Sequence, residues 1–480
     1  MHDEQSSYAV AEANRLALVS PAGFGKTELI CSLVDECDGK ALVLTHTRAG
    51  VTALRKRFAK NGISSAQATV TTIAGYCEFW ASSYPSRSGF TGFSYMRNLK
   101  SKENEYYRDL YIGATQVVSS GWAQRVIRTS YKLIVVDEYQ DCTQTQQELI
   151  LALSKEVMLR VLGDPMQGIF YWIKDEDLVD WKNLSFPYDE LKSKPWRWIN
   201  SGHPNLGEVV SSIRNDLIPT LTGHSVNVDL YSYGDGIHLI SKESISKGAL
   251  PREVRESQSV LFLTGTIRQQ LSFARQTFGF QCEEKIDPEE LIALADAVDN
   301  SAGPELCLSV LSFCKLCFTK VTENLGSYIS RLEKGSVDFS RIRKLPHVGA
   351  VLSKIATDGI PYDIAILLKS LRAESEFRVY RASLISEAIS VLDDAVDSGR
   401  PIREEMDNRR LGIQQGGHNR YRFTSSRTVL SKGLEYETVL VDASSITDAR
   451  DFYVAISRCT MDLYVISDSP ILHFNGIDCS

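Results

Sequence analysis

The sequence predicts an α/β protein in which parallel sheets are flanked by helices. Short apolar runs rich in β-branched residues recur along the chain, polar loops follow several of them, and helical patterns separate them. The 480 residues are 43% hydrophobic and 24% charged, which suffices for two to four domains with sizeable cores. The formal net charge of −7 argues against a general nucleic-acid-binding coat but allows a local basic groove.

The first apolar run, residues 16–19, leads into a glycine-rich loop and then into a helical pattern. In this order, backbone N–H groups of the loop can converge on a phosphate chain whose charge the helix dipole favours. Lys26 is expected to contact the β and γ phosphates and the Thr27 hydroxyl to ligate Mg²⁺. The alternative is a chance Gly-Lys-Thr turn. The residues expected to bind the nucleotide are Ser20, Pro21, Ala22, Gly23, Phe24, Gly25, Lys26, Thr27 and Glu28.

A second motif argues against the chance turn. The apolar run at residues 132–136 ends in Asp137 and Glu138, which places two adjacent carboxylates at the carboxyl end of a strand. Ligands bind at this edge of α/β sheets. We therefore expect Asp137 to hold Mg²⁺ and Glu138 to orient and deprotonate the attacking water. The alternative is a solvated acidic turn, which explains one acidic residue better than the whole segment.

Two more strands are expected at residues 41–45 and 68–72. Their ends carry groups able to contact an anionic partner beside the nucleotide. The basic helix that follows the earlier strand is better explained as a solvated face. The residues expected to contact the nucleic acid here are Thr45, His46, Arg48 and Thr72.

The run at residues 157–162 predicts another strand with a polar loop after it. In that loop Gln167 can sense the γ-phosphate, while Tyr171 and Trp172 can stack on a base. Between residues 84 and 131, aromatic and basic residues mix with Ser and Gly, which indicates an insertion. This composition suits either a strand-binding surface or a small aromatic core.

Later apolar runs predict a second sheet, and helical patterns dominate between residues 282 and 415. Within this helical region Cys314 and Cys317 have a metal-ligand spacing, but the surrounding pattern favours a buried helix. The ten cysteines lack a paired framework, and the chain has neither a secretory leader pattern nor a membrane-length apolar stretch. We therefore expect a cytoplasmic protein without membrane contact. The runs of the second sheet are 260–264, 438–442 and 463–467.

Taken in order, eight segments resemble the superfamily 1 helicase motifs of the UvrD/Rep family. The resemblance implies two RecA-like P-loop domains with ATP and Mg²⁺ between them, moving on single-stranded DNA, usually 3′ to 5′. The compact length is also similar to the UvrD-like helicase subunit of Gabija-type phage-defence systems, where a nuclease is the partner. The segments are 20–27, 45–58, 72–76, 137–141, 163–172, 194–198, 431–436 and 453–459.

The resemblance also implies roles for residues outside the loops described so far. Gln5 corresponds to an adenine-reading position, and Gly433 and Glu435 lie in the segment that holds the ribose. Arg197 and Arg458 correspond to two arginines that reach the γ-phosphate from the second domain and neutralise charge on the transferring phosphoryl group. Departures from the family pattern, including His46 and Arg48, fall on the strand-contacting side. ATP hydrolysis therefore has stronger support than processive unwinding.

The implied organisation has a first RecA-like domain at residues 1–190, with an insertion at about 84–131. Residues 191–281 and 416–480 form the second RecA-like domain, and 282–415 its helical insertion. The leading function is an ATP-driven DNA helicase or translocase acting on single-stranded DNA or DNA ends. The alternative is an ATPase subunit that regulates a partner nuclease in anti-phage defence and unwinds little by itself. A metabolic P-loop kinase does not account for the arginines or the Gln167 loop.

Overall fold

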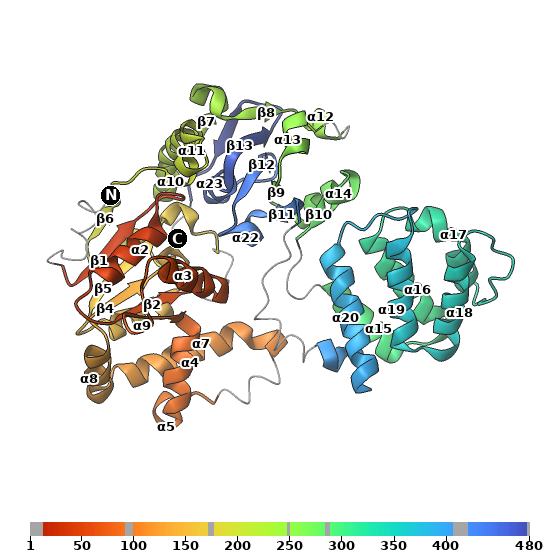
Figure 1. Ribbon diagram of the computed structural model, residues 1–480, viewed down its shortest axis with the longest axis horizontal. Helices are drawn as coiled ribbons and strands as arrows, with labels where there is room; N and C mark the ends of the chain where they lie inside the picture. Colours follow the sequence, from red (N-terminus) through yellow and green to blue (C-terminus); the bar gives the residue numbers. More distant parts are fainter. Residues whose placement is uncertain are drawn as a thin grey trace. The chain divides into compact units, whose positions relative to one another are not determined.

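The computed structural model describes residues 13–91, 99–170, 177–246, 250–283, 289–406 and 421–477. Its described part confirms the α/β class, with two six-stranded sheets and surrounding helices (Figure 1). The chain divides into two compact units. The first comprises Met1–His238, Thr447–Asp462 and Ser469–Ser480, and the second comprises Leu239–Ile446 and Leu463–Asp468.

The first sheet has the strand order β3-β2-β4-β5-β1-β6, and every neighbouring pair is parallel. The strands expected from the apolar runs are all present, and the short edge strand β6 is an addition to them. In this order β4 and β5 lie between β2 and β1. The strands are β1 (Arg15–Val19), β2 (Ala41–Thr45), β3 (Ala68–Thr72), β4 (Leu133–Val136), β5 (Met158–Gly163) and β6 (Tyr188–Glu190).

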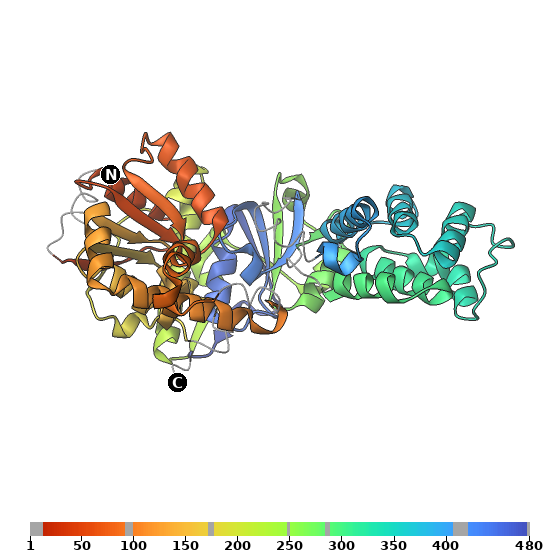
Figure 2. The ribbon, with the colours of Figure 1, turned by 90° about the horizontal axis from the view of Figure 1, so that it is seen from below.

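Helices cover both faces of this sheet (Figure 2). Alternate residues of β1 enter different cores: Leu16 and Leu18 pack with the core that contains α2 and α3, whereas Ala17 packs with the core of α4, α7 and α9. Burial on both faces explains why these strands are continuous apolar runs. The helices are α2 (Lys26–Asp35), α3 (Arg48–Lys60), α4 (Ile73–Ser83), α5 (Pro85–Ser88), α7 (Leu99–Val118), α8 (Gly121–Ser130) and α9 (Gln144–Leu153).

The parallel registers bring the loops after several strands to one edge of the sheet. Val19 is the register partner of Gly163, and Thr45 is the partner of Thr72. The Ser20 amide donates to the Gly163 carbonyl over 2.8 Å, and the Asp137 amide donates to Leu44 over 2.8 Å. The phosphate loop, the acidic pair and the Gln167 loop therefore begin side by side, as expected for the carboxyl edge of a parallel sheet.

The first unit also contains three helices from segments that the sequence assigned to the second domain. These are α10 (Trp196–Asn200), α11 (Pro204–Leu217) and α23 (Ala449–Ile456). Trp198 of α10 is fully buried, and α23 packs against both α11 and the short helix η2 (Pro165–Gln167). These contacts group the three helices with the first sheet. An antiparallel pair, β7 (Val226–Asp229) and β14 (Ile471–Phe474), completes the unit.

The second sheet has the order β10-β11-β9-β12-β13-β8, and the pairs β10–β11, β11–β9 and β9–β12 are parallel. Phe262 of β9 stacks on Phe273 of α14, with ring centroids 3.6 Å apart, in the core beside the sheet. The elements are β8 (His238–Ile240), α12 (Lys242–Ser246), α13 (Arg252–Glu256), β9 (Val260–Thr264), α14 (Ile267–Gln276), β10 (Gln281–Cys282), β11 (Phe423–Arg427), α22 (Thr428–Ser431), β12 (Tyr436–Asp442) and β13 (Cys459–Ile466).

A run of helices with its own hydrophobic core lies between β10 and β11 in the sequence. Cys314 and Cys317 are fully buried in α16, which confirms the buried helix expected there. None of the described helices combines the length and apolar content needed to cross a membrane. The helices are α15 (Glu289–Asn300), α16 (Gly303–Cys317), α17 (Val321–Leu332), α18 (Pro346–Asp358), α19 (Pro361–Ala373) and α20 (Ala382–Ser398).

Candidate nucleotide site

The phosphate loop has the backbone geometry of an anion-binding turn. Gly23 and Gly25 have φ angles of 77° and 88°, a region that glycine adopts without the steric cost borne by other residues. Gly25 is the N-cap of α2, and no side chain caps this helix end in the described chain. The buried Ser20 hydroxyl has no hydrogen-bond partner among the described residues. The N-terminal N–H groups of α2 can therefore bind an anion.

Helix α10 packs against this loop. A Cβ atom at Gly23 would lie 2.8 Å from Cζ3 of Trp198 and 2.9 Å from Cβ of Arg197. The Arg197 amide donates to the Gly23 carbonyl over 3.0 Å. The Ser193 hydroxyl donates to the Phe24 carbonyl over 3.0 Å. A side chain larger than hydrogen cannot be accommodated at residue 23 unless this packing shifts.

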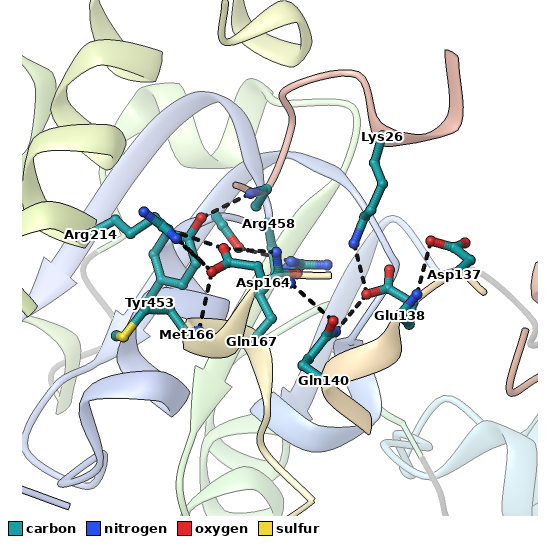
Figure 3. A network of polar contacts seen from close by, with 12 residues as sticks. Lys26, Asp137, Glu138, Gln140, Asp164, Met166, Gln167, Arg214, Tyr453 and Arg458 are labelled. Atoms are coloured by element: carbon teal, nitrogen blue, oxygen red, sulfur yellow. Dashed lines mark hydrogen bonds and ion pairs between the residues drawn. The ribbon is translucent and has the colours of Figure 1, made fainter. Parts of the chain in front are cut away.

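Lys26 and Gln140 bind the same carboxylate oxygen of Glu138 (Figure 3). The Lys26 Nζ atom lies 2.8 Å from Oε2 of Glu138, and Nε2 of Gln140 lies 2.6 Å from that oxygen. Glu138 has a φ of 54° and a ψ of 43°, left-handed values that cost a non-glycine residue about 1–2 kcal/mol. The short helix η1 (Tyr139–Asp141) starts directly afterwards. The strained backbone directs this carboxylate toward the lysine of the phosphate loop.

Burial and neighbouring charges shift the pKa values of Lys26 and Asp137. Burial alone lowers the pKa of Lys26, but the negative charges of Glu138 and Asp137 outweigh it and raise that pKa overall. Burial, and then the charge of Glu138, raise the pKa of Asp137 to about 7. A carboxyl group with this pKa binds a proton easily, and a divalent cation would compete with that proton.

A buried ion pair lies beside the acidic motif. Nη2 of Arg214 lies 2.8 Å from Oδ1 of Asp164, and Nε of Arg214 lies 3.2 Å from Oδ2. Asp164 is fully buried, and Arg214 is only 5% exposed. The same carboxylate accepts from the Met166 amide at 3.1 Å and from Nε2 of Gln167 at 3.3 Å. Asp164 therefore fixes the conformation of the loop that carries Gln167.

Three further contacts connect this ion pair with the acidic motif and the phosphate loop. The Asp164 amide donates to Oε1 of Gln140 over 3.0 Å, so Gln140 bridges Asp164 and Glu138. The Ala22 amide of the phosphate loop donates to the Tyr453 hydroxyl over 2.9 Å. The Arg214 guanidinium lies 6.0 Å from the centre of the Tyr453 ring. Burial, and then the charge of Asp164, raise the pKa of Tyr453. Its hydroxyl therefore stays protonated at neutral pH.

The sequence motifs alone do not predict functional roles for Gln140, Arg214 or Tyr453. One available signal was the position of Arg214 on the apolar face of α11, where Val210, Ile213 and Leu217 are also buried. A charged residue on such a face needs a buried partner. The identity of that partner, 50 residues away at Asp164, depends on tertiary packing.

The two arginines expected at the γ-phosphate lie in the same compact unit as Lys26. Arg197 donates through Nη1 to the Ser457 carbonyl. Arg458 is 2% exposed and donates through Nε to the Val454 carbonyl over 2.9 Å. The sequence had assigned both to the second domain. Arg197 reaches the loop because α10 packs on Gly23, and Arg458 follows α23 in the chain.

The residues expected to contact nucleic acid lie at the ends of β2 and β3. Thr45 is buried, whereas Arg48 is exposed at the start of α3. The Thr72 hydroxyl caps α4 by accepting from the Gly75 amide over 2.9 Å. Nε2 of His46 lies 3.4 Å from Sγ of Cys142, just after the acidic motif. Their role in binding remains a prediction, and Gln5, Tyr171 and Trp172 lie outside the described residues.

Four other predicted nucleotide contacts have defined positions. Thr27 is exposed in the first turn of α2. The Glu28 carboxylate forms an ion pair with Arg57 and accepts from Nδ2 of Asn61 over 3.2 Å, so it turns toward α3. Gly433 has a φ of 82°, and Glu435 directly precedes β12 in the second unit. The proposed contact of Gly433 and Glu435 with the ribose remains a prediction.

Comparison with known proteins identifies the family of one segment. Residues 90–176 match the family model of the UvrD/REP helicase N-terminal domain. The segment contains the acidic motif and the Gln167 loop, and the match confirms the resemblance that the ordered motifs predicted. The comparison with curated proteins gave no significant match. Among solved structures, the chain is similar to the Pif1 helicase from Candida albicans, with 12% identity, 98% of this chain and 94% of that chain covered, and a TM-score of 0.38.

Proposed function

We propose that the chain is an ATP-dependent DNA helicase or translocase. The observation that carries the proposal is the contact between Lys26 of the phosphate loop and Glu138 of the acidic motif, 2.8 Å apart at the carboxyl edge of a parallel sheet. Nucleotide-hydrolysing P-loop proteins need a phosphate-binding lysine and a water-orienting acid at one edge. The family match over residues 90–176 supports the same conclusion.

The residues present fit a magnesium nucleotide. The uncapped N-terminus of α2 and the left-handed Gly23 and Gly25 suit a phosphate chain. Lys26 would bind its β and γ phosphates, and Thr27 and Asp137 would hold the metal. The bound metal would supply charge neutralisation at the transferring phosphoryl group. Glu138 would accept a proton from the attacking water, and Gln167, Arg197 and Arg458 would lie near the γ-phosphate.

The proposal extends to the partner and the domain organisation. The substrate strand is single-stranded DNA or a DNA end, with 3′ to 5′ movement. Residues 1–190 form the first RecA-like domain and 191–281 with 416–480 the second, of which helices α10, α11 and α23 pack with the first sheet. The helical segment 282–415 is an insertion. Nucleotide binding and hydrolysis drive the conformational cycle in which the strand advances one step at a time.

The test is ATP hydrolysis by the purified chain with and without single-stranded DNA. DNA is expected to raise the rate at least severalfold, and Lys26→Ala is expected to abolish hydrolysis with the fold intact. Lys155→Ala is the matched control, because Lys155 is exposed in the segment before β5, at the amino edge of the sheet and not at the edge that carries the phosphate loop. Equal rates with and without any DNA would contradict translocation.

A second candidate is a regulatory ATPase subunit that controls a partner nuclease in phage defence. One observation favours it: His46, at a position where the family has a stacking aromatic, contacts Cys142 at 3.4 Å. An imidazole ring that contacts Cys142 is less available for stacking on a base. A strand-displacement assay on a forked duplex separates the two candidates. Robust unwinding by the isolated chain would exclude the second, whereas DNA-stimulated hydrolysis without unwinding would favour it.

A further inference from the structure

The phosphate loop is anchored by a residue far away in the sequence. The backbone N–H of Ala22 donates to the hydroxyl of Tyr453 over 2.9 Å, although the two residues are 431 positions apart in the sequence. Both residues are buried. Ala22 precedes the two left-handed glycines of the loop, and Tyr453 lies in the middle of α23. The contact therefore joins α23 to the start of the turn that would hold phosphate.

The Tyr453 side chain is itself held in place. Helix α23 packs against η2 and α11, which carry Gln167 and Arg214 respectively. The Arg214 guanidinium lies 6.0 Å from the ring centre, within the range of a cation–π contact. The same guanidinium binds Asp164 through both Nε and Nη2. A two-pronged contact of this kind fixes orientation as well as distance.

Asp164 connects this cluster to the other side of the site (Figure 3). Its carboxylate accepts a hydrogen bond from Nε2 of Gln167, and its backbone amide donates to Oε1 of Gln140. Gln140 in turn donates to Glu138, which binds Lys26. The contacts thus run from Ala22 through the cluster and back to Lys26 in the same phosphate loop.

We propose that Tyr453 is a positioning residue for the phosphate loop. Arg214 and Asp164 hold Tyr453 in place, and the three residues together keep the loop and Gln167 in the conformation that binds nucleotide. The inference rests on the proposed function, because it concerns how the same site is preorganised. It also gives Tyr453 a role separate from packing. A phenylalanine would fill the same space, and only the hydroxyl can accept the Ala22 N–H.

The preorganised loop should bind nucleotide more tightly than a loop without this anchor. Without the hydroxyl, the Ala22 N–H has no acceptor at that position and the loop can rotate away from the phosphate-binding conformation. Loss of one buried hydrogen bond corresponds to about a fivefold to tenfold change in an equilibrium constant. Nucleotide affinity, rather than the turnover of bound nucleotide, is therefore the sensitive quantity.

The experiment compares ADP binding by the full chain and by Tyr453→Phe, using a fluorescent ADP analogue without DNA. Tyr328→Phe is the matched control, because its buried hydroxyl also contacts backbone, with the Lys344 and Leu345 carbonyl oxygens 2.8 and 2.9 Å away in the helical segment. Thermal unfolding is measured for each variant. Arg214→Lys is the second variant, because it keeps the charge but loses the two-pronged contact.

We expect Tyr453→Phe to weaken ADP binding about fivefold to tenfold and to raise KM for ATP by a similar factor, with a smaller change in kcat. Arg214→Lys should weaken binding in the same direction, whereas Tyr328→Phe should leave it unchanged. If Tyr453→Phe lowers the unfolding temperature but binds ADP as the wild type does, its role is structural and the inference is overturned. If Tyr453→Phe does not fold, wild-type affinity in Arg214→Lys overturns it equally. A wild-type chain that binds no ADP would instead overturn the proposed function itself, and the inference with it.

Discussion

The Lys26 ammonium and the Glu138 carboxylate form an ion pair at 2.8 Å. Both groups have other proposed roles, since the lysine would bind phosphate and the carboxylate would take a proton from water. Gln140 binds the same oxygen of Glu138 at 2.6 Å, so the carboxylate is held on two sides. A bound phosphate would therefore compete with Glu138 for the lysine.

Glu138→Gln should separate binding from hydrolysis. Loss of a general base lowers the rate of hydrolysis by about 10²–10⁴-fold. Nucleotide affinity should rise severalfold, because the amide neither holds Lys26 as strongly nor repels phosphate. Steady-state hydrolysis and ADP titration measure the two effects. Weaker ADP binding by this variant would contradict competition between the carboxylate and phosphate.

Asp137 should make the stability of the metal-free chain depend on pH. Its pKa is about 7 in the folded chain and 3.8 in the absence of burial and neighbouring charge. Between these values the folded state binds more protons than the unfolded state, so this group destabilises the fold as pH rises through that window. The effect is at most about 1.4 kcal/mol per pH unit and levels off above pH 7.

Asp137→Asn should therefore become more stable relative to wild type as pH rises from about 4 to about 7. Thermal unfolding in the presence of a chelator measures this difference. Glu138→Gln removes the neighbouring negative charge and should shift the wild-type dependence to lower pH. A stability difference that stays constant across this window would show that Asp137 titrates in its ordinary range.

Gly23→Ala tests the packing behind the phosphate loop. Gly23 and Gly62 have nearly equal φ angles, 77° and 76°, but only Gly23 has atoms within 4 Å of an added Cβ. Gly62→Ala should cost about 1–2 kcal/mol of stability for the left-handed backbone alone. Gly23→Ala should cost about 1–3 kcal/mol more, because the Cβ meets Trp198, and should weaken nucleotide binding. Equal unfolding free energies for the two variants would argue against this packing.

Arg214→Met should be strongly destabilising because it leaves Asp164 buried without a counter-charge. Removal of one member of a buried pair costs about 3–5 kcal/mol. Arg128→Met is the control, because Arg128 and Glu156 are also 2.8 Å apart but are about half exposed. An exposed pair contributes about 0–1 kcal/mol. Chemical denaturation measures both, and similar losses would contradict the buried environment of the Arg214 pair.

Five of the six strands of the first sheet, and the loops that follow them, could be predicted from the sequence, whereas the short edge strand β6 could not. Residues 133–136 are apolar on both faces of the strand because both faces are buried, so the strand and its ends can be recognised from the sequence. The phosphate loop is equally local, because Gly23, Gly25 and Lys26 are close in the chain and their geometry depends on near neighbours. For the same reason Asp137 and Glu138 could be placed at the edge of the sheet.

The contacts of Gln140, Arg214 and Tyr453 with these loops, and the packing of α10 and α23 with the first sheet, depend on the tertiary fold. Buried polar groups take whichever partner the packing brings within hydrogen-bond distance, and the 431 residues between Ala22 and Tyr453 carry no periodic signal of that contact. Local periodicity encodes which elements form, whereas long-range packing selects which side chains meet.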